Sequence, residues 1–380
     1  MGKQYDVLII GGGVIGCSIA YQLAKRGKKV LILEKDRIAG KASSAAAGML
    51  GVHTELSSNS SLYQLAKASR SLYPSLAEEL TSICGIDIEL VQNGMLKLAR
   101  SEEEAHKLMG MHAQSDRNEG ITWLSGSQLS AMEPNLSDQL TGGLWIPDDG
   151  NVSAPKLSNA LGLAAAKMGA KILEYTEVST FLKEDDRIIG VETNRGFIYA
   201  ENTIMAAGAW SGSLLDHLDM NYGAYPVKGE CFSVTAPRSL VRATLFTDGC
   251  YIVPKVGGRL LIGATEKPHS FDENISLDSL LHLMEKATAL VPDLKYAHWD
   301  RAWAGIRPQT ELGIPLMEKS REWKGLFAAT GHYRNGILLA PITGVLMADL
   351  IEGRENPLLN IFRRSGESGI KNKRSACHST

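Results

Sequence analysis

The chain has 380 residues, of which 44% are hydrophobic and 22% charged, as in a globular protein large enough for two domains. Its formal net charge of -2 argues against nucleic acid or an acidic membrane surface as a partner. We find no apolar run near the ~18 residues that cross a bilayer, and we therefore expect a cytoplasmic protein. The five cysteines and nine histidines lie scattered, without the paired spacing of a disulfide framework or a metal site.

The chain begins with a strand–turn–helix–strand pattern. The apolar run Val7–Ile10 predicts a buried strand, and the apolar residues after Val14 follow a helical period that Gly27 is placed to end. A second apolar run, Val30–Leu33, predicts another strand, which is closed by the acid Glu34. This order is that of a βαβ unit.

Three glycines, Gly11, Gly13 and Gly16, lie in the turn of this unit with the spacing G-x-G-x-x-G. Gly11 would permit the tight turn, Gly13 would let the backbone approach a pyrophosphate, and Gly16 would let the helix pack close to the strand. Glu34 is placed to accept hydrogen bonds from ribose hydroxyls, and its charge disfavours a 2′-phosphate. The unit therefore predicts dinucleotide binding; the alternative is a glycine-rich turn in an ordinary α/β protein.

The next segments indicate a mixture of helices and strands. A run of small residues, Ala42–Met49, would let the backbone come close to a flat ligand. Apolar periodicity predicts helices near 60–83, 102–114 and 155–170, and strands at 171–174, 188–192 and 196–199. A further buried strand at 203–207 stops at Gly208, at the carboxyl end where ligands bind in open α/β sheets.

The second half of the chain changes character. Strands at 227–234, 250–254 and 259–263 have antiparallel hairpin chemistry, a helix follows at 277–290, and 302–308 leads into a loop. A last buried strand at 326–330 ends in a glycine-containing loop, and a helix covers 342–352.

We therefore expect an α/β fold with two domains: a Rossmann-like cofactor domain with a parallel sheet, and an α+β substrate domain with a mainly antiparallel sheet. The predicted cofactor domain is discontinuous and the predicted tail is polar. The cofactor domain would comprise 1–88, 147–220 and 303–364, the substrate domain 89–146 and 221–302, and the tail 365–380. A second G-x-G-x-x-G is absent, which disfavours a nicotinamide cofactor beside a flavin.

Five segments then point to a family: IIGGGVIGCSIAYQLAKRG, SSAAAGMLG, PVKGECFSV followed by CYIVPK, RAWAGIRPQT, and GHYRNGILLAP. The chain resembles the FAD-dependent amine oxidases of the D-amino-acid oxidase family, and within it the bacterial glycine oxidases, from about Tyr5 to Phe362. The resemblance implies a non-covalent FAD and the conversion of glycine, oxygen and water to glyoxylate, ammonia and hydrogen peroxide. It also implies supply of the thiazole part of thiamine, and a homotetramer.

The resemblance carries over a cofactor site and a substrate site. The cofactor-lining residues would be the three glycines with Val14, Ile15, Glu34, Lys35, Ala42, Ser43, Ala47, Gly48, Met49, Val178, Gly208, His332, Tyr333, Arg334, Asn335, Gly336, Ile337 and Leu338. Tyr251, Arg307 and Arg334 match the positions that hold the substrate. Arginine suits a carboxylate because its planar fork makes two parallel hydrogen bonds. We expect Arg307 in a loop that Pro308 stiffens, and no acid–base residue, because hydride transfer from a neutral amine needs none.

Two positions depart from the family pattern, since Gly249 stands where a histidine, and Glu266 where a methionine, is expected. An acid at 266 would alter the preference among amine substrates or face solvent. Other readings stay open: an oxidase of sarcosine or small D-amino acids, a dehydrogenase that uses an acceptor other than oxygen, and a non-catalytic flavin-binding redox sensor. An NAD-dependent dehydrogenase leaves the second flavin-type segment, 331–336, unexplained.

Overall fold

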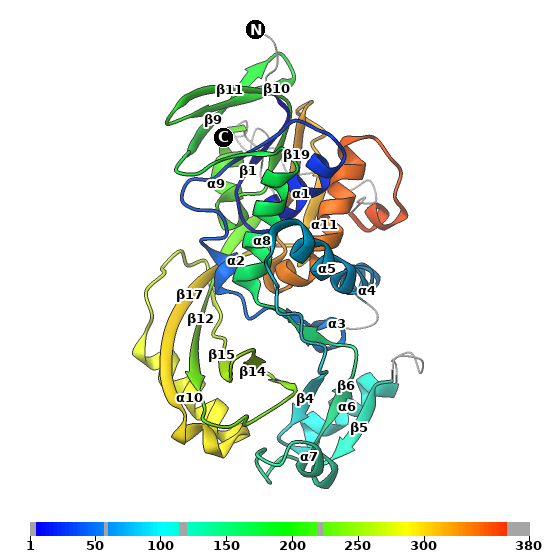
Figure 1. The fold of residues 1–380 in the computed structure, drawn as a ribbon, viewed down its shortest axis with the longest axis vertical. Helices are drawn as coiled ribbons and strands as arrows, with labels where there is room; N and C mark the ends of the chain where they lie inside the picture. The colour runs from blue at the N-terminus through cyan, green and yellow to red at the C-terminus, as the bar shows by residue number, and fades with distance from the viewer. Residues whose placement is uncertain (1–4, 57–59, 114–119, 219, 221–222, 363–380) are drawn as a thin grey trace, which may run out of the picture.

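The structure is a computed structural model that describes residues 5–56, 60–113, 120–218, 220 and 223–362. Two β-sheets lie one above the other along the longest axis, each with its own helices (Figure 1). The chain passes between the two regions several times, so that both regions combine segments far apart in the sequence. The predicted α/β class with one mainly parallel and one mainly antiparallel sheet is confirmed.

The first sheet has a parallel centre. Its main strands run in the order β18-β19-β11-β1-β2-β8, and all neighbours are parallel except β18 with β19. β9 and β10 extend β11 as antiparallel strands. The strands span β1 Tyr5–Ile10, β2 Val30–Leu33, β8 Lys171–Leu173, β9 Val178–Glu184, β10 Arg187–Thr193, β11 Gly196–Met205, β18 Leu316–Lys319 and β19 Leu326–Thr330.

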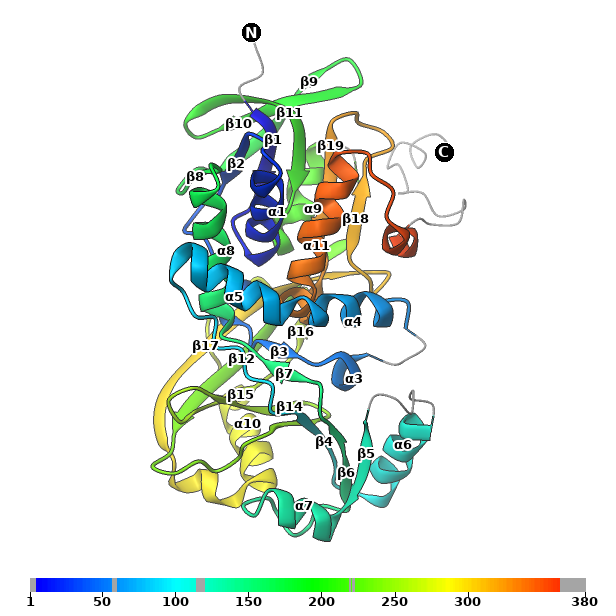
Figure 2. The same cartoon turned by 45° about the vertical axis from the view of Figure 1, so that its right-hand side comes forward.

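Helices cover the parallel sheet and enclose the larger core. α1 packs between α8 and α11, and α4 and α5 lie across them (Figure 2). The helices span α1 Val14–Lys25, α4 Tyr63–Ser71, α5 Tyr73–Cys84, α8 Ala154–Lys167 and α11 Gly336–Ile351. The β1 residues Val7–Ile10 are at most 4% exposed, as expected for a strand buried on both faces.

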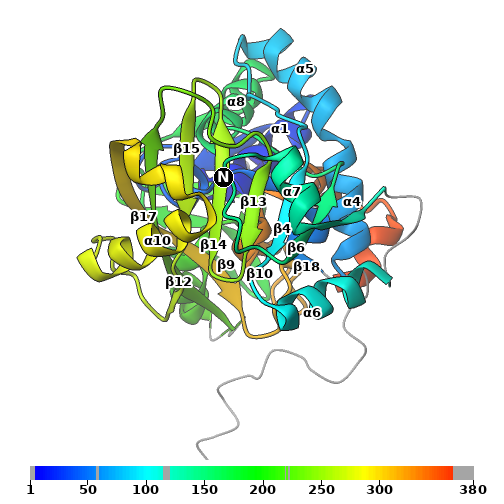
Figure 3. The same ribbon diagram turned by 90° about the horizontal axis from the view of Figure 1, so that it is seen from below.

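The second sheet is antiparallel apart from the β4–β13 pair. α10 (Leu277–Leu290) packs on β12, β14 and β15, and α7 (Gly126–Met132) and α6 (Glu102–Ala113) pack near β5 and β6 (Figure 3). A second apolar core lies between this sheet and α10. The strands span β4 Met95–Ala99, β5 Thr122–Ser125, β6 Gly142–Ile146, β12 Ala224–Thr235, β13 Thr244–Thr247, β14 Cys250–Lys255, β15 Arg259–Gly263, β16 Lys267–Pro268 and β17 His298–Thr310.

Three local predictions were wrong. The segment 60–83 forms two helices, α4 and α5, because Pro74 favours a new helix start rather than a helix interior. The segments 196–199 and 203–207 belong largely to one strand, β11, which pairs with β10 over 196–199 and with β1 over 200–205. Arg307 and Pro308, which were expected in a loop, lie in a strand: β17 extends to Thr310 and pairs with β12 over its whole length.

The last helix begins earlier than predicted, at Gly336, and continues through Pro341. Proline removes the N–H that would bind the carbonyl four residues back. Here that carbonyl, on Ile337, accepts a hydrogen bond from the Tyr73 hydroxyl, and the Ser69 hydroxyl donates to the next carbonyl at 2.6 Å. Hydroxyl groups from α4 and α5 thus bind the carbonyl oxygens of α11 near the point where the proline interrupts its hydrogen bonds.

The segment Tyr333–Ile351 is long and apolar enough, by length and composition, to cross a membrane, so the expectation that no stretch reaches this length was wrong. Its most apolar window is 61% buried inside the protein, as in the core helix of a globular fold. The predicted domain boundaries stay a prediction; β17 runs across the one expected between 302 and 303. The predicted polar tail, 365–380, lies outside the described residues.

Candidate active site

A cavity of about 300 Å³ is lined by residues from both sheets. Its walls come from the carboxyl ends of β1 and β2 on one side and from β12, β14 and β17 on the other. This is the edge at which parallel α/β sheets bind ligands, and the volume is within the range of small-molecule sites.

The β1–α1 turn has room only for glycine at two places. Gly11 has φ +109, and a Cβ there would lie 2.4 Å from the Ala206 carbonyl oxygen. A Cβ on Gly16 would lie 2.0 Å from the carbonyl oxygen of Gly11, so the helix and the strand end touch through Gly16. Gly13 precedes α1 and offers no side-chain cap of its own, and the first N–H of the helix, on Val14, donates to the Ser43 hydroxyl. The next N–H groups of the first turn have no partner within the helix, so they can bind a ligand in the cavity.

Glu34 is fixed at the end of β2 by backbone donors. Its Oε2 accepts from the Gly12 N–H at 2.7 Å and its Oε1 from the Asp36 N–H at 2.9 Å. A carboxylate has about four acceptor positions, so it retains capacity for ligand hydroxyls. Nearby, Lys35 lies 4.1 Å from the centre of the Trp210 ring, which also lines the cavity.

The small-residue segment predicted from 42–49 forms α2 (Ala42–Ala45) and β3 (Met49–Leu50) along the cavity. The Ser43 hydroxyl accepts from the Val14 N–H at 2.9 Å and so holds this segment against α1. Gly48 has φ +78, and a Cβ there would lie 2.0 Å from the Val152 carbonyl oxygen. The backbone therefore approaches the cavity without side-chain bulk.

The segment 332–336 closes the far end of the cavity. His332 is 3% exposed, and its Nε2 lies 3.1 Å from the Thr343 hydroxyl. Burial lowers the pKa of His332 to about 3, so the ring is neutral at physiological pH. A 3₁₀ turn, Tyr333–Asn335, leads directly into α11 at Gly336, and the N-terminal end of this helical segment lines the cavity.

Tyr251 comes from β14 and is 6% exposed. Burial raises the pKa of Tyr251 well above its usual value, so its hydroxyl is retained as a hydrogen-bond donor. Its described contact is Cys231 Sγ at 3.4 Å. Gly263 makes room for the ring, because a Cβ there would lie 2.5 Å from the hydroxyl oxygen.

Arg307 comes from β17, where it lies opposite Val227 of β12. Its guanidinium lies against Gly229, whose Cβ, if present, would be 2.3 Å from both Nη atoms. Nη1 donates to the Thr265 carbonyl oxygen at 3.2 Å. Among the described residues, no carboxylate lies within 4.0 Å of this guanidinium, so the cavity holds a cation without a counter-ion.

Arg334 also lines the cavity but has two acidic partners. Its Nε and Nη2 bind both oxygens of Glu55 at 2.8 and 2.9 Å, and its Nη1 binds Glu266. Burial opposes the charge, but Glu55 and Glu266 outweigh it and raise the pKa of Arg334. Glu266 is therefore an ion-pair partner of Arg334, whereas Gly249 lies exposed in the β13–β14 turn.

The cavity brings together nearly all the predicted site residues. Of the predicted cofactor and substrate residues, only Gly16 and Leu338 do not line it. Gly16 forms the helix–strand contact, and Leu338, 1% exposed, packs into the core behind the wall. Glu55 and Gly229 were missed. A glycine inside a predicted strand signals that another group approaches the backbone closely, so the sequence could have pointed to Gly229 in β12. No pattern marks Glu55.

These features define a class. A cavity with an open helix N-terminus, an acid for ribose hydroxyls, an unpaired arginine and a protonated tyrosine belongs to an oxidoreductase that holds a dinucleotide cofactor against a small anionic substrate.

Comparison with known proteins identifies the family. Residues 6–350 match the model of the DAO family, described as FAD dependent oxidoreductase, and the chain belongs to this family. It is 47% identical to a glycine oxidase of Geobacillus kaustophilus, over 98% of this chain and 100% of that protein. The crystal structure of glycine oxidase from Geobacillus kaustophilus superimposes with a TM-score of 0.92, at 48% identity, covering 95% of this chain and 99% of that one.

A further relative is longer. The bifunctional protein ThiO/ThiG of Trichormus variabilis is 35% identical over 95% of this chain but only 55% of its own length.

The cofactor of this family is FAD, and the cavity fits it. Its walls are rich in glycine and alanine, and at Gly11 and Gly48 a Cβ would meet backbone atoms, so the backbone itself lines the cavity there. The N-terminal residues of α1 and α11 also line it, which suits an anionic, flat group.

Proposed function

We propose that this protein is an FAD-dependent oxidase that converts glycine, oxygen and water to glyoxylate, ammonia and hydrogen peroxide. The observation that carries the proposal is Arg307, an unpaired cation against Gly229 and in the same cavity as Tyr251. An α-carboxylate is the anion that this fork fits. The similarity to glycine oxidases over nearly the whole chain supports the same assignment.

The chain's own residues would bind and orient the reactants. Gly11, Gly13 and Glu34 would hold the ADP half of FAD, and the residues from His332 to Ile337 would surround its flavin ring. Arg307 would hold the substrate carboxylate, with the Tyr251 hydroxyl as a further donor. When bound there, FAD would supply the redox chemistry, as the hydride acceptor for the substrate and the electron donor to oxygen.

No acid–base residue is required of the protein in this reaction. The neutral amine of the substrate supplies the electron pair as the hydride leaves. His332, neutral and bonded to Thr343, is buried and takes no base role in the proposal. Catalysis then depends on position, because Cα must lie about 3–3.5 Å from the accepting atom, with water excluded.

Arg334 has a less direct place in the proposal. Its Nε and Nη2 are occupied by Glu55, and its Nη1 by Glu266. Contact with the substrate, as expected from the resemblance, stays a prediction and requires a remaining N–H of this guanidinium or exchange of Glu266.

The nearest alternative is an oxidase of sarcosine or small D-amino acids. One added methyl group changes binding by only about 1–3 kcal/mol, so glycine is placed first on the similarity and not on the cavity width. A dehydrogenase with another acceptor is the second alternative. A non-catalytic redox sensor binds no substrate carboxylate, so it would not require Arg307, which has no acidic partner among the described residues.

The cellular setting is also a proposal. We propose a cytoplasmic homotetramer that serves the synthesis of the thiamine thiazole. The relative that combines ThiO with ThiG in one chain supports the thiamine role. In the part of the chain that the structure describes, the one helix long and apolar enough to cross a membrane, Tyr333–Ile351, is 61% buried in its most apolar window, which fits the cytoplasmic setting. Light scattering on the purified protein measures the assembly.

The deciding experiment measures hydrogen peroxide and oxygen uptake with glycine, sarcosine and D-alanine. The proposal expects the highest kcat/KM for glycine, with one peroxide for each oxygen consumed. Turnover with a dye but without oxygen uptake would identify a dehydrogenase, and a preference for sarcosine or D-alanine would replace the substrate.

A further inference from the structure

Two charged side chains are buried on β12 without facing the cavity. Lys228 is 1% exposed and Glu230 is 2% exposed. Alternate residues of a strand point to opposite faces, and Gly229, which lies between them, is the residue that lines the cavity beneath Arg307. The same short segment therefore carries the substrate clamp on one face and a buried ion pair on the other.

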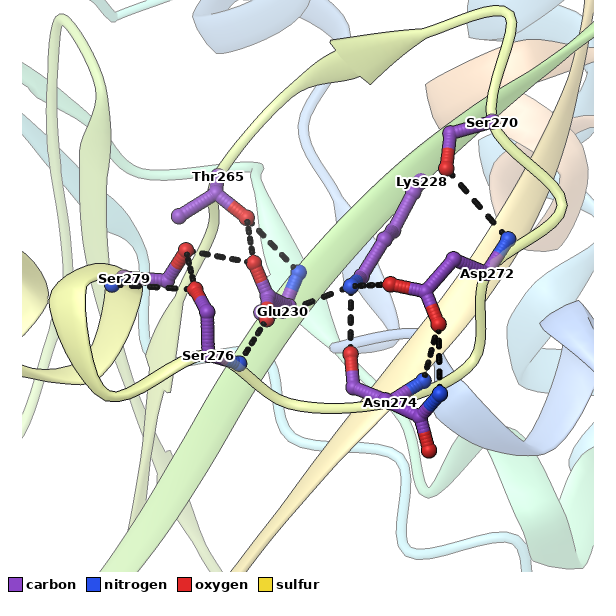
Figure 4. A network of polar contacts seen from close by, with 8 residues as sticks. All are labelled: Lys228, Glu230, Thr265, Ser270, Asp272, Asn274, Ser276 and Ser279. Carbon is purple, nitrogen blue, oxygen red and sulfur yellow. Dashed lines mark hydrogen bonds and ion pairs between the residues drawn. The ribbon is translucent and has the colours of Figure 1, made fainter.

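The ion pair ties β12 to the chain segment that follows β15 (Figure 4). Lys228 Nζ binds Asp272 Oδ2 at 2.7 Å and the Asn274 carbonyl, and lies 3.5 Å from Glu230 Oε1. The bond from Lys228 and the backbone donor at Asn274 lower the pKa of Asp272 to about 2.

The Glu230 carboxylate accepts hydrogen bonds from the same segment. Its Oε1 accepts from the Ser276 N–H at 2.6 Å, and its Oε2 from the Ser279 hydroxyl at 2.5 Å and the Thr265 hydroxyl at 3.2 Å (Figure 4). Burial would raise the pKa of Glu230, but these donors and Lys228 outweigh it and lower the pKa, so the carboxylate stays charged.

Thr265 connects this network to the clamp. Its hydroxyl accepts from the Glu230 N–H at 3.0 Å, and its own N–H donates to the Glu230 carbonyl at 3.3 Å. Its carbonyl oxygen accepts the bond from Arg307 Nη1, the one hydrogen bond that this guanidinium makes with the described residues. The next residue, Glu266, binds Arg334.

We propose that the Lys228–Glu230 network is a positioning device: through Thr265 it fixes the direction of Arg307 and so sets the affinity for the substrate carboxylate. This inference rests on the proposed function for its substrate. Replacing a buried ion pair by apolar residues of similar volume is often neutral or stabilising, so the pair is weak evidence for a role in stability. Orientation of the Arg307 guanidinium gives the two charges a function.

The test compares Thr265→Val, which keeps the shape but loses the hydroxyl, with Thr265→Ser, which keeps the hydroxyl. Thr288→Val on α10 is the matched control, because that hydroxyl bonds only within its own helix. The measurements on the FAD-loaded protein are KM and kcat for glycine, and the dissociation constant of acetate, read from the change in flavin absorption. Acetate carries the carboxylate without the amine.

The proposal expects Thr265→Val to raise the glycine KM and the acetate dissociation constant together, by about threefold to tenfold, with kcat within about twofold. Thr265→Ser and Thr288→Val should stay near wild type. Unchanged KM and acetate binding in Thr265→Val, with only a lower melting temperature or less active protein, would overturn it.

Two further outcomes are separated by design. If Thr265→Val fails to fold, Glu230→Gln takes its place, since the amide keeps the shape and one acceptor while removing the charge; the same joint rise is expected. If wild type binds acetate but does not oxidise glycine, the proposed function fails while the acetate comparison still tests the network. Wild type that does not bind acetate at all overturns the inference.

Discussion

Removal of the Arg307 guanidinium should abolish most turnover and leave FAD bound. In the described structure this cation has one neutral acceptor, the Thr265 carbonyl, and no carboxylate partner, so its fork is available to the substrate. A charge-assisted hydrogen bond contributes about 1.5–3 kcal/mol, so a two-bond clamp contributes roughly 3–6 kcal/mol. At about 1.4 kcal/mol per tenfold, Arg307→Ala should lower kcat/KM for glycine by roughly 100-fold to 10,000-fold.

The assay is steady-state peroxide release, with flavin content measured from the visible spectrum. Arg307→Lys keeps the charge but not the fork and should lose about tenfold to 100-fold. Arg301→Ala is the matched control, because Arg301 lies exposed on the same strand, 5.0 Å from the Trp303 ring; its kcat/KM should stay within about twofold. Arg307→Ala with near-normal kcat/KM would refute the clamp.

Three further predictions follow from glycine contacts and burial. Gly16→Ala places a Cβ 2.0 Å from a backbone carbonyl oxygen, so it should lower the melting temperature and the FAD content. Gly110→Ala, where nothing lies within 4 Å of the new Cβ, should instead stabilise α6 by up to about 1 kcal/mol. Calorimetry and the flavin spectrum measure both variants, and equal behaviour of the two would contradict the Gly16 contact. Gly229→Ala would displace the Arg307 guanidinium, 2.3 Å away, and should raise the glycine KM about tenfold or more while FAD stays bound; an unchanged KM would show that the arginine adapts. The pKa of His332 is about 3 in the folded chain and near 6.5 in the unfolded chain. Between these values the unfolded chain binds the proton more strongly, so the free energy of unfolding should decrease as the pH is lowered through this range. From pH 7 to pH 5 the free energy of unfolding of wild type should drop by about 2 kcal/mol through His332. Urea unfolding of His332→Asn should lack this drop. Equal losses in wild type and variant would exclude a buried neutral ring.

The cofactor end of the site was predictable because backbone sterics determine it. The spacing of Gly11, Gly13 and Gly16 with Glu34 already specifies a strand, a tight turn and a helix, and the structure places the turn at the cavity. The family resemblance added Tyr251 and Arg307, which strand patterns alone could not single out, because a half-buried tyrosine or arginine is common in sheets.

What could not be predicted depends on contacts between distant segments. Arg307 was expected in a loop, since Pro308 usually interrupts strands, but an edge strand paired on one side tolerates proline. The pairing of Glu55 with Arg334 joins residues 279 positions apart, and no local pattern records it. Thr265 binds Arg307 through its backbone carbonyl oxygen. Every residue type has this group, so the sequence gives no sign of the contact.

The most direct test of the account is the visible spectrum of the purified protein, followed by anaerobic addition of glycine. We expect the two visible bands of an oxidised flavin, their bleaching by glycine, and hydrogen peroxide equal to the reduced flavin when oxygen is admitted. The flavin should be released when the chain is denatured by acid or heat. A protein without these bands, or a bound flavin that glycine does not reduce, would contradict FAD-dependent glycine oxidation.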